Sequence, residues 1–502
     1  MDLVSYVLQN AFLPEVIIFT AIGIFLGVTV GAIPGISGHV AIAILLPIVF
    51  KMDTVASLGM LLGIYKGSMF GGAISAISFG VPGTGAAVVT VLDGYQAKKN
   101  GYPKKAMFTA LYSSVTGDLF STLFLIFLAV PLAGVSLKFG PIEFFALYVF
   151  AILMIAFLVQ GEIKKGIVAA GIGLLIGCIG TDPVTGATRL IFGISLLRGG
   201  IPLVPLLVGI FAVSELIIQF SKAIYQSKSK KIKKLAGLFN EIDYDSSKDK
   251  MNFKVYLSNF KSTLIGSVTG TFVGALPGAG SSLAAFVSYG VASRFSSHPE
   301  EWGKGILEGV AAPEAANSAT CGASLIPLLA FGIPGSATAA LIGAAFTMQG
   351  INPGPLLFQE NLPLIFTLFV VIFYASIMNL GISYTLIPFY SKIALIKPMF
   401  LYPSVFVFAL IGTYACRNSI NDIWILIVAG LLGLLLRKGR FPLGPLVLAY
   451  IIGPGAEKAL RQALLIGAGE WSILLKSPIA IGFYLISIVI IILYSKFEFG
   501  KK

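Results

Sequence analysis

The chain has 502 residues, of which 57% are hydrophobic and only 11% are charged. A soluble protein of this length would carry about 25% charged residues, so the composition excludes a set of soluble domains. The mean hydropathy of +0.93, together with abundant Gly and Pro inside apolar runs, predicts an all-α polytopic membrane protein.

The remaining counts exclude several chemistries. The net charge of +13 is interpreted as loop charge that fixes membrane topology, so no nucleic-acid partner is expected. Cys178, Cys321 and Cys416 each stand alone in apolar sequence, which favours packing thiols over a metal site or disulfides. The two histidines are far apart and no P-loop motif occurs, so we expect no catalytic residues, no resident metal and no cofactor.

Along the chain, apolar segments alternate with one long polar stretch. They run to about residue 220, give way to a lysine-rich segment at 221–261, and then resume. Positive charge favours the cytoplasm, so this segment is predicted to be a cytoplasmic linker. At about 20 residues per span, roughly ten to thirteen membrane elements fit. The predicted units are a first transmembrane repeat at 1–220, the linker, a second repeat at 262–475, and a C-terminal helix and cytoplasmic tail at 476–502.

The two apolar halves contain matching sequence. Three motifs recur in the same order at offsets near 240 residues, which indicates an internal duplication. The pairs are GVTVGAIPG (27–35) with GTFVGALPG (270–278), FGVPGTGA (79–86) with FGIPGSAT (331–338), and IPLVPLL (201–207) with FPLGPLV (441–447).

Loop charge predicts that the two copies are inverted. The segment after the first FGxPG motif, 97–105, carries four lysines, whereas its counterpart at 347–363 carries no basic residue. Equivalent loops therefore favour opposite sides of the membrane. The first fifty residues contain no Lys or Arg, so the N-terminus is expected outside and the C-terminus inside. This topology requires one extra helix, which 479–494 can supply.

Each copy carries two Pro-Gly pairs inside apolar sequence. Such breaks expose helix-end amides, which bind anions, and free carbonyls, which bind cations. Small and hydroxylated neighbours let a ligand approach the backbone, although kinked and closely packed helices are the alternative. The predicted substrate-binding residues are Pro34, Gly35, Ser37, Gly38, Lys66, Pro82, Gly83, Thr84, Gly85, Gly278, Gly280, Ser281, Asn317, Ser318, Pro334, Gly335 and Ser336.

A candidate cation site lies in the segment 308–325. Pro313 is predicted in the first turn of a helix, with Glu314 just inside it. Glu314, Asn317 and Ser318 are spaced to share one helix face, and a carboxylate, an amide and a hydroxyl suit a Na⁺ or H⁺ coupling site. The alternative is an interface helix with a solvated glutamate.

Lys66 is the corresponding ionisable residue of the first copy. Aligning the FGxPG motifs places it opposite Ser318. It is predicted to face the same cavity as Glu314, where it neutralises a substrate carboxylate or pairs with Glu314; the alternative is snorkelling to a boundary. Asp118 and Asp182 have no obvious partners in the sequence, which disfavours an intramembrane enzyme.

Together, these motifs resemble the TctA family, the large membrane subunit of the tripartite tricarboxylate transporters. Two positions differ from the usual family pattern: Lys66 follows Tyr65 where Tyr-Tyr-Gly is usual, and Ser318 follows Asn317 where Asn-Asn is usual. The resemblance rests on 27–50, 70–95, 181–193, 273–289, 308–319, 329–344 and 440–460.

The resemblance implies a function and partners. A member of this family would import tri- or dicarboxylates across a prokaryotic inner membrane, driven by an ion gradient. Its partners would be the organic anion, the lipid bilayer, a small membrane subunit and an extracytoplasmic solute-binding protein; a homo-oligomer is left open. The alternatives are a transporter of another small solute that needs no binding protein, a channel, and an intramembrane enzyme.

Overall fold

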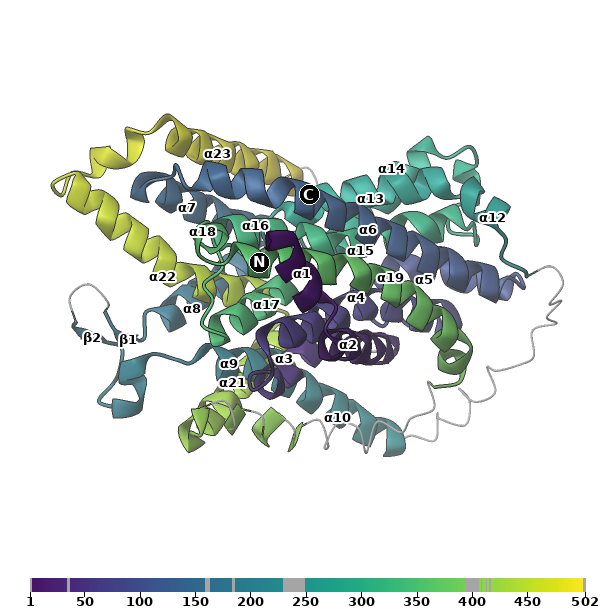
Figure 1. Cartoon of the computed structure of the whole chain (residues 1–502), viewed down its shortest axis with the longest axis horizontal. Coiled ribbons are helices and arrows are strands. Elements are labelled where there is room, and N and C mark those ends of the chain that lie inside the picture. The colour runs from purple at the N-terminus through teal and green to yellow at the C-terminus, as the bar shows by residue number, and fades with distance from the viewer. Residues whose placement is uncertain are drawn as a thin grey trace.

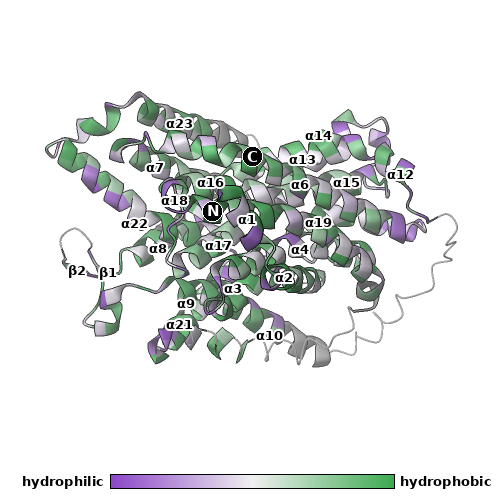
Figure 2. Ribbon diagram, viewed as in Figure 1, coloured by the Kyte–Doolittle hydropathy of each residue, from purple (hydrophilic) through white to green (hydrophobic). Residues whose placement is uncertain are grey.

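A computed structural model describes most of the chain as helices. The described residues are 2–33, 37–158, 163–182, 186–228, 249–393, 406–407, 409–411, 413–414 and 417–499. Within these ranges the only strands are β1 (Gly180–Thr181) and β2 (Thr188–Arg189), which form a short antiparallel hairpin (Figure 1). Hydrophobic residues occur along most of the helices (Figure 2).

Within the described residues, six helices are long and apolar enough to cross a membrane, and four shorter apolar helices accompany them. The predicted all-α polytopic membrane architecture is therefore confirmed. The six spans are Pro14–Ala32, Thr54–Phe79, Pro103–Ser136, Leu203–Ser221, Leu362–Phe389 and Ile420–Lys438.

The first half of the chain ends in a continuous helical segment, α9, η2 and α10, of which η2 is a π-helix. Its elements are α1 (Leu3–Ala11), α2 (Pro14–Ala32), α3 (Gly38–Val49), α4 (Thr54–Phe79), α5 (Ala87–Lys99), α6 (Pro103–Ser136), α7 (Pro141–Leu158), α8 (Ile163–Gly177), the hairpin, η1 (Ser195–Gly199), α9 (Leu203–Leu207), η2 (Val208–Val213) and α10 (Ser214–Lys228).

The second half, like the first, begins with a short helix that is followed by three longer ones. Its elements are α12 (Phe253–Ser258), α13 (Phe260–Ala275), α14 (Gly280–Phe295), η3 (Pro299–Glu301), α15 (Glu308–Ala323), α16 (Leu325–Phe331), α17 (Ala337–Met348), α18 (Leu357–Glu360), α19 (Leu362–Ile393), α21 (Ile420–Lys438), α22 (Leu443–Ile466), η4 (Trp471–Leu475) and α23 (Pro478–Phe499).

Corresponding helices of the two halves make corresponding contacts. In the first half α2 packs along α4, and in the second half α13 packs along α15. The halves also interleave, because α6 packs on α15 while α19 packs on α4. The buried core is thus shared between the halves and brings α4 and α15 to the centre of the molecule (Figure 1). The inverted orientation and the domain boundaries stay predictions.

The Pro-Gly breaks interrupt helices where the structure describes them. Pro82-Gly83 lies between α4 and α5, Pro277-Gly278 between α13 and α14, and Pro334-Gly335 between α16 and α17. Pro34 and Gly35 lie outside the described residues; α2 ends before them and α3 begins after them.

Helices α2 and α13 each carry two glycines at GxxxG spacing, Gly27 with Gly31 and Gly270 with Gly274. Glycine is also required at the break that packs on each of these helices, Pro82-Gly83 in the first copy and Pro334-Gly335 in the second. A Cβ added to Gly83 would lie 2.2 Å from the carbonyl oxygen of Gly31. A Cβ added to Gly335 would lie 3.0 Å from the carbonyl oxygen of Gly274, the equivalent residue of the second copy. The GxxxG motifs therefore let the interrupted segment pack directly on backbone.

The predicted position of Pro313 at a helix start is wrong. Helix α15 begins at Glu308, so Pro313 lies inside it. Asp93 of α5 explains the earlier start, because its Oδ1 accepts from the backbone amides of Gly305 and Ile306 at 2.8 and 3.2 Å. Gly305 and Ile306 lie just before α15, so the carboxylate fixes the segment that leads into the helix and opposes the positive end of the helix dipole. The structure therefore extends α15 by more than a turn beyond the prediction.

Asp182, which the sequence left without a partner, joins a surface ion-pair network. Arg461 of α22 lies 2.8 Å from Asp182 and 2.7 Å from Glu457, and Arg189 of the hairpin lies 2.7 Å from Glu457. The hydrogen bond to Glu457 raises the pKa of the Arg189 guanidinium above its ordinary value. Arg189 thus fastens the hairpin to α22.

Candidate functional site

Helix α15 presents three polar side chains to the interior. Glu314, Asn317 and Ser318 have exposed fractions of 0%, 1% and 2%. The predicted spacing on one helix face is therefore correct, and the solvated-glutamate alternative is excluded. A carboxylate at this depth needs a hydrogen-bond donor, a proton or a cation.

The Glu314 carboxylate has a donor on one oxygen only. The hydroxyl of Thr90, on α5, donates to Oε1. Among the described residues, no donor reaches Glu314 Oε2 or the side-chain oxygen of Asn317, and both atoms are buried. The Asn317 side-chain amide donates one of its two hydrogens to the carbonyl of Met69, 3.2 Å away. Two buried oxygens on adjacent helical turns are thus left for a cation or a proton.

Ser318 is tied to the first copy. Its hydroxyl lies 2.5 Å from the hydroxyl of Ser114 on α6. This contact holds α15 against α6, one helical turn of α6 before Asp118. Ser318 therefore stands between the Glu314 oxygens and a second buried polar group.

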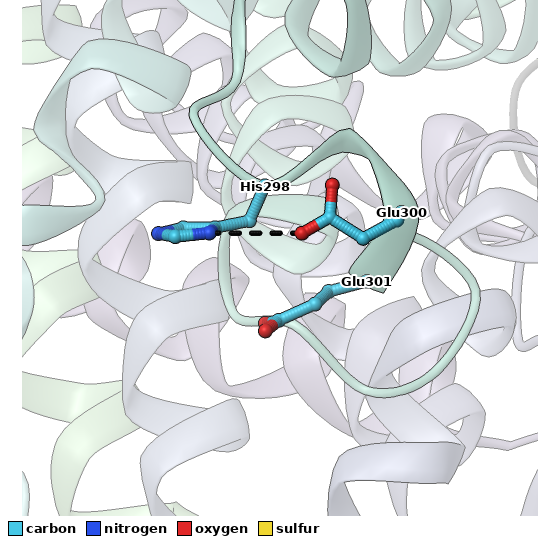
Figure 3. Close-up of side chains that lie close together, drawn as sticks. All are labelled: His298, Glu300 and Glu301. Atoms are coloured by element: carbon cyan, nitrogen blue, oxygen red, sulfur yellow. Dashed lines mark ion pairs between the residues drawn. The ribbon is translucent and has the colours of Figure 1, made fainter.

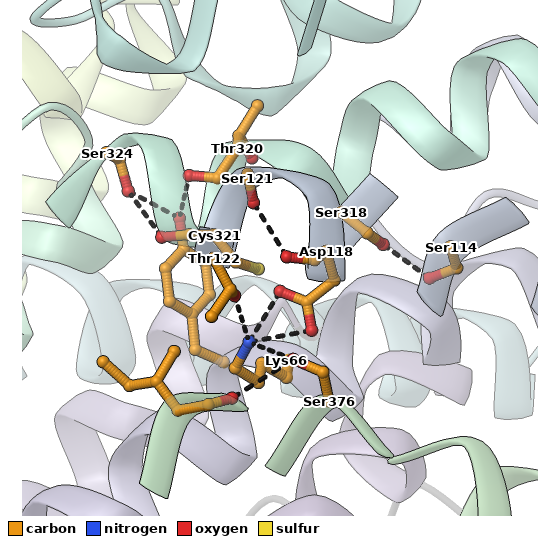
Figure 4. Close-up of polar contacts among 12 residues, drawn as sticks. Lys66, Ser114, Asp118, Ser121, Thr122, Ser318, Thr320, Cys321, Ser324 and Ser376 are labelled. Carbon is orange, nitrogen blue, oxygen red and sulfur yellow. Dashed lines mark hydrogen bonds and ion pairs between the residues drawn. The ribbon is translucent and has the colours of Figure 1, made fainter. Parts of the chain in front are cut away.

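That second group is centred on Lys66, which is 3% exposed and does not snorkel to a boundary. Its amine contacts both carboxylate oxygens of Asp118, at 2.6 and 2.8 Å (Figure 4). The alternative that paired Lys66 with Glu314 is therefore wrong. Asp118 lies on α6 directly across from Lys66 and supplies the opposite charge that a buried ammonium needs.

Tyr65, next to Lys66, connects α4 to the Pro334-Gly335 break, which is called the second break below. Its hydroxyl lies 3.1 Å from the Ser324 hydroxyl and 3.4 Å from the Ser336 hydroxyl. Ser336 also caps α17 by accepting from the amide of Ala339 at 3.1 Å. The helix that starts after the second break is therefore anchored to the helix that carries Lys66.

The Pro82-Gly83 break of the first copy approaches the second copy at Gly85. A Cβ on Gly85, just after the first break, would lie 2.7 Å from the Ser282 hydroxyl of α14. Thr84 lies against Gly72 of α4, and the Ser37 hydroxyl is 2.8 Å from the His39 ring. Around Gly280 no described atom falls within 4 Å of an added Cβ. The described break residues of the predicted set therefore lie in loops or at helix starts, whereas Lys66 lies within α4 and Asn317 and Ser318 lie within α15. The structure does not bring the set to one point.

A cavity of about 620 Å³ opens beside the second break. Phe331 and Gly332, which end α16, line it together with Tyr148 and Lys458. Its volume suits a small organic molecule. None of the predicted substrate-binding residues lines it, and Lys458 gives it a positive group that the sequence reasoning missed.

A cluster of metal-ligating side chains occurs at the surface. His298, just before η3, lies close to Glu300 and Glu301 of η3, with 3.8 Å between the His298 Nδ1 and a Glu300 oxygen (Figure 3). All three are exposed, and acidic groups of this kind are common without an ion. We assign this cluster no functional role.

Comparison with known proteins gives a consistent result. A family model described as "Tripartite tricarboxylate transporter TctA family" matches residues 17–448. An uncharacterised 52.8 kDa protein of the TAR-I ttuC' 3' region of Agrobacterium vitis is 37% identical over 489 residues, covering 96% of this chain and 94% of that protein. An uncharacterised protein of the TAR-II ttuC' 3' region of the same organism is 38% identical over 225 residues, covering 45% of this chain and 93% of that protein. No solved structure matches the chain.

Proposed function

Because the chain belongs to the tripartite tricarboxylate transporter TctA family, we propose that it imports an organic di- or tricarboxylate in symport with a monovalent cation. The family is one of transporters, not enzymes, and the chain is its large membrane subunit. Substrate would arrive from an extracytoplasmic binding protein, with a small membrane subunit as partner, in a prokaryotic inner membrane.

The observation that carries this proposal is the incomplete hydrogen bonding of Glu314. Its free Oε2 and the free side-chain oxygen of Asn317 lie on one face of α15, and Thr90 holds the other Glu314 oxygen. A cation held there would stay hidden from lipid and water, since all of these side chains are buried. A cation bound there would hold α15 against α5, because Glu314 lies on α15 and Thr90 on α5. Since α5 follows the Pro82-Gly83 break, cation binding would also position that break, and this couples the cation to the substrate.

The predicted substrate site lies at the break loops, where Gly85 faces Ser282 and Ser336 caps α17. Helices α5, α14 and α17 begin at these loops, and helix N-termini bind carboxylates. The cavity beside Gly332 gives an approach to the second break, and Lys458 would attract the anion there.

The test is uptake of labelled di- and tricarboxylates into proteoliposomes that contain the chain, its small subunit and the binding protein. We expect uptake only with an inward Na⁺ or H⁺ gradient, and imposing each gradient alone separates the two ions. Glu314→Gln should abolish the gradient dependence, whereas Glu308→Gln, a partly exposed acid on the same helix, should not. Uptake that is independent of any gradient would contradict the proposal and favour a channel.

Partner dependence is tested in the same system. Uptake by the chain without the binding protein, at the full rate, would favour the alternative of a transporter that binds its solute directly. Loss of uptake without the binding protein, restored by adding it, supports the proposed delivery.

A further inference from the structure

The Lys66 amine is surrounded by four oxygen atoms from two helices, α6 and α19. Asp118 contributes both carboxylate oxygens at 2.6 and 2.8 Å, and Thr122, also on α6, contributes its hydroxyl at 3.3 Å. The fourth oxygen is the hydroxyl of Ser376 on α19, at 2.8 Å (Figure 4). Lys66 itself comes from α4, so the two halves of the chain meet at this nitrogen.

The geometry is that of a cation cage rather than of a simple ion pair. An ammonium group has three hydrogens, yet four oxygens surround this one. The Ser376 hydroxyl donates to the carbonyl of Ile372 at 3.1 Å, so it turns a lone pair toward Lys66. One carboxylate and two hydroxyls are also the kind of oxygen ligands that hold hard metal cations.

Because the cage is buried, the Asp118 carboxylate needs a cation beside it. Lys66 and Asp118 are 3% and 2% exposed, so Asp118 cannot rely on water to balance its charge. The amine is also saturated by these contacts. A substrate carboxylate could reach it only by displacing Asp118, which argues against Lys66 as a substrate ligand.

From this geometry we propose that Asp118, Thr122 and Ser376 form a latent Na⁺ site, which Lys66 fills with its own ammonium group. The ammonium is a cation tethered to the chain and cannot be transported. The cage lies one turn along α6 from the Ser114–Ser318 contact, next to the Glu314 site. This consequence rests on the proposed function: the wild-type chain binds and transports one Na⁺ fewer than a chain in which no lysine fills the Asp118, Thr122 and Ser376 site.

Ion binding to the purified full chain in lipid nanodiscs tests the proposal without any transport step. Lys66→Ala removes the tethered cation and leaves the oxygens in place. We expect this variant to bind one more ²²Na⁺ per chain than the wild type. We also expect NaCl, compared with choline chloride at equal ionic strength, to raise its Tm more than that of the wild type.

Two control variants isolate the cage. Lys66→Ala combined with Asp118→Asn removes both buried charges and should bind no additional Na⁺; Lys66→Arg keeps a tethered cation and should also bind none. If Lys66→Ala binds no more Na⁺ than the double variant, the proposal is overturned.

Folding of the single variant is also informative. If Lys66→Ala is folded only when purified in Na⁺, that result supports the cage, since the ion has replaced the amine. If it is unfolded with and without Na⁺ while the double variant folds, Na⁺ cannot occupy the site and the proposal is overturned. Gradient-independent uptake would defeat the proposed function but would leave this binding result standing.

Discussion

The buried carboxylates of Asp118 and Glu314 have different surroundings. Each lies four residues from the Ser114–Ser318 contact, Asp118 on α6 and Glu314 on α15. Asp118 is neutralised by Lys66, whereas Glu314 has only the Thr90 hydroxyl on one oxygen and no donor among the described residues on the other. Because a buried carboxylate without a partner is costly, Glu314 is the group that gains from binding a cation. The Thr90 hydroxyl should then hold the Glu314 carboxylate in the position that binds the cation.

We expect Thr90→Val to weaken cation binding. Valine keeps the shape of threonine but cannot donate to Glu314, and a hydrogen bond to a charged group contributes about 1.5–3 kcal/mol. The cation concentration for half-maximal uptake should rise by about ten- to a hundredfold. Thr90→Ser keeps a hydroxyl and should stay near the wild type. Equal cation dependence of Thr90→Val and Thr90→Ser would show that Thr90 does not act on the site.

At this scale the sequence identified the polar residues but not their partners. Lys66, Glu314 and Asn317 could be predicted because an ionisable or amide side chain in apolar sequence is conspicuous. Asp118 is conspicuous for the same reason, but its pairing with Lys66 could not be predicted, and no motif or spacing marks Thr90. Their roles arise from the packing of α6 against α4 and of α5 against α15, which is set by tertiary structure.

At the scale of elements, the breaks depend on close contact between backbones. The segment after α4 folds back onto α2 at the point where Gly83 meets Gly31. A side chain at Gly83 must push the two segments apart or distort the loop. The stability of this contact should therefore be sensitive to a single methyl group.

We predict that Gly83→Ala destabilises the chain by about 1–3 kcal/mol, the usual cost of overpacking, and that it lowers the Tm. The control is Gly134→Ala near the end of α6, where no described atom lies within 4 Å of the added Cβ. That substitution should leave the Tm unchanged or raise it slightly, since alanine favours a helix. A similar Tm for the two variants would mean that the Gly83 contact does not hold the break.

The sequence predicted the breaks well and one helix start poorly. Pro-Gly pairs inside apolar runs mark an interruption by themselves, since proline removes a backbone donor and glycine relaxes the chain. The start of α15 was missed because the amides of Gly305 and Ile306, just before it, are bound by Asp93, more than 200 residues away in the sequence. Proline at position 313 is instead accommodated within the helix.

At the scale of the molecule, duplication and interleaving explain why the sites lie at the centre. Helices α4 and α15 occupy equivalent places in the two copies, and each packs against the long helix of the other copy, α19 and α6. The matching motifs predicted the duplication, but they could not predict that each copy would complete the other's polar site. Ser376 beside Lys66 and Thr90 beside Glu314 are both examples of such exchange.

The inverted orientation makes a prediction about access from the two sides of the membrane. Lys99, at the end of α5, and Gln359, on α18, are both exposed and follow equivalent breaks. Inverted copies must place them on opposite sides, with the lysine-rich segment in the cytoplasm. In a chain whose three cysteines are replaced by alanine, Gln359→Cys should react with an impermeant maleimide added to right-side-out vesicles.

Lys99→Cys should react only after the vesicles are permeabilised, and the cysteine-free chain provides the background. Labelling of both positions from the outside would mean that the copies are parallel, so the charge difference between segments 97–105 and 347–363 would need another cause. Parallel copies would also bring equivalent ends of the breaks to the same side of the membrane. An inverted repeat that places one binding site between its two copies would then be excluded for this chain.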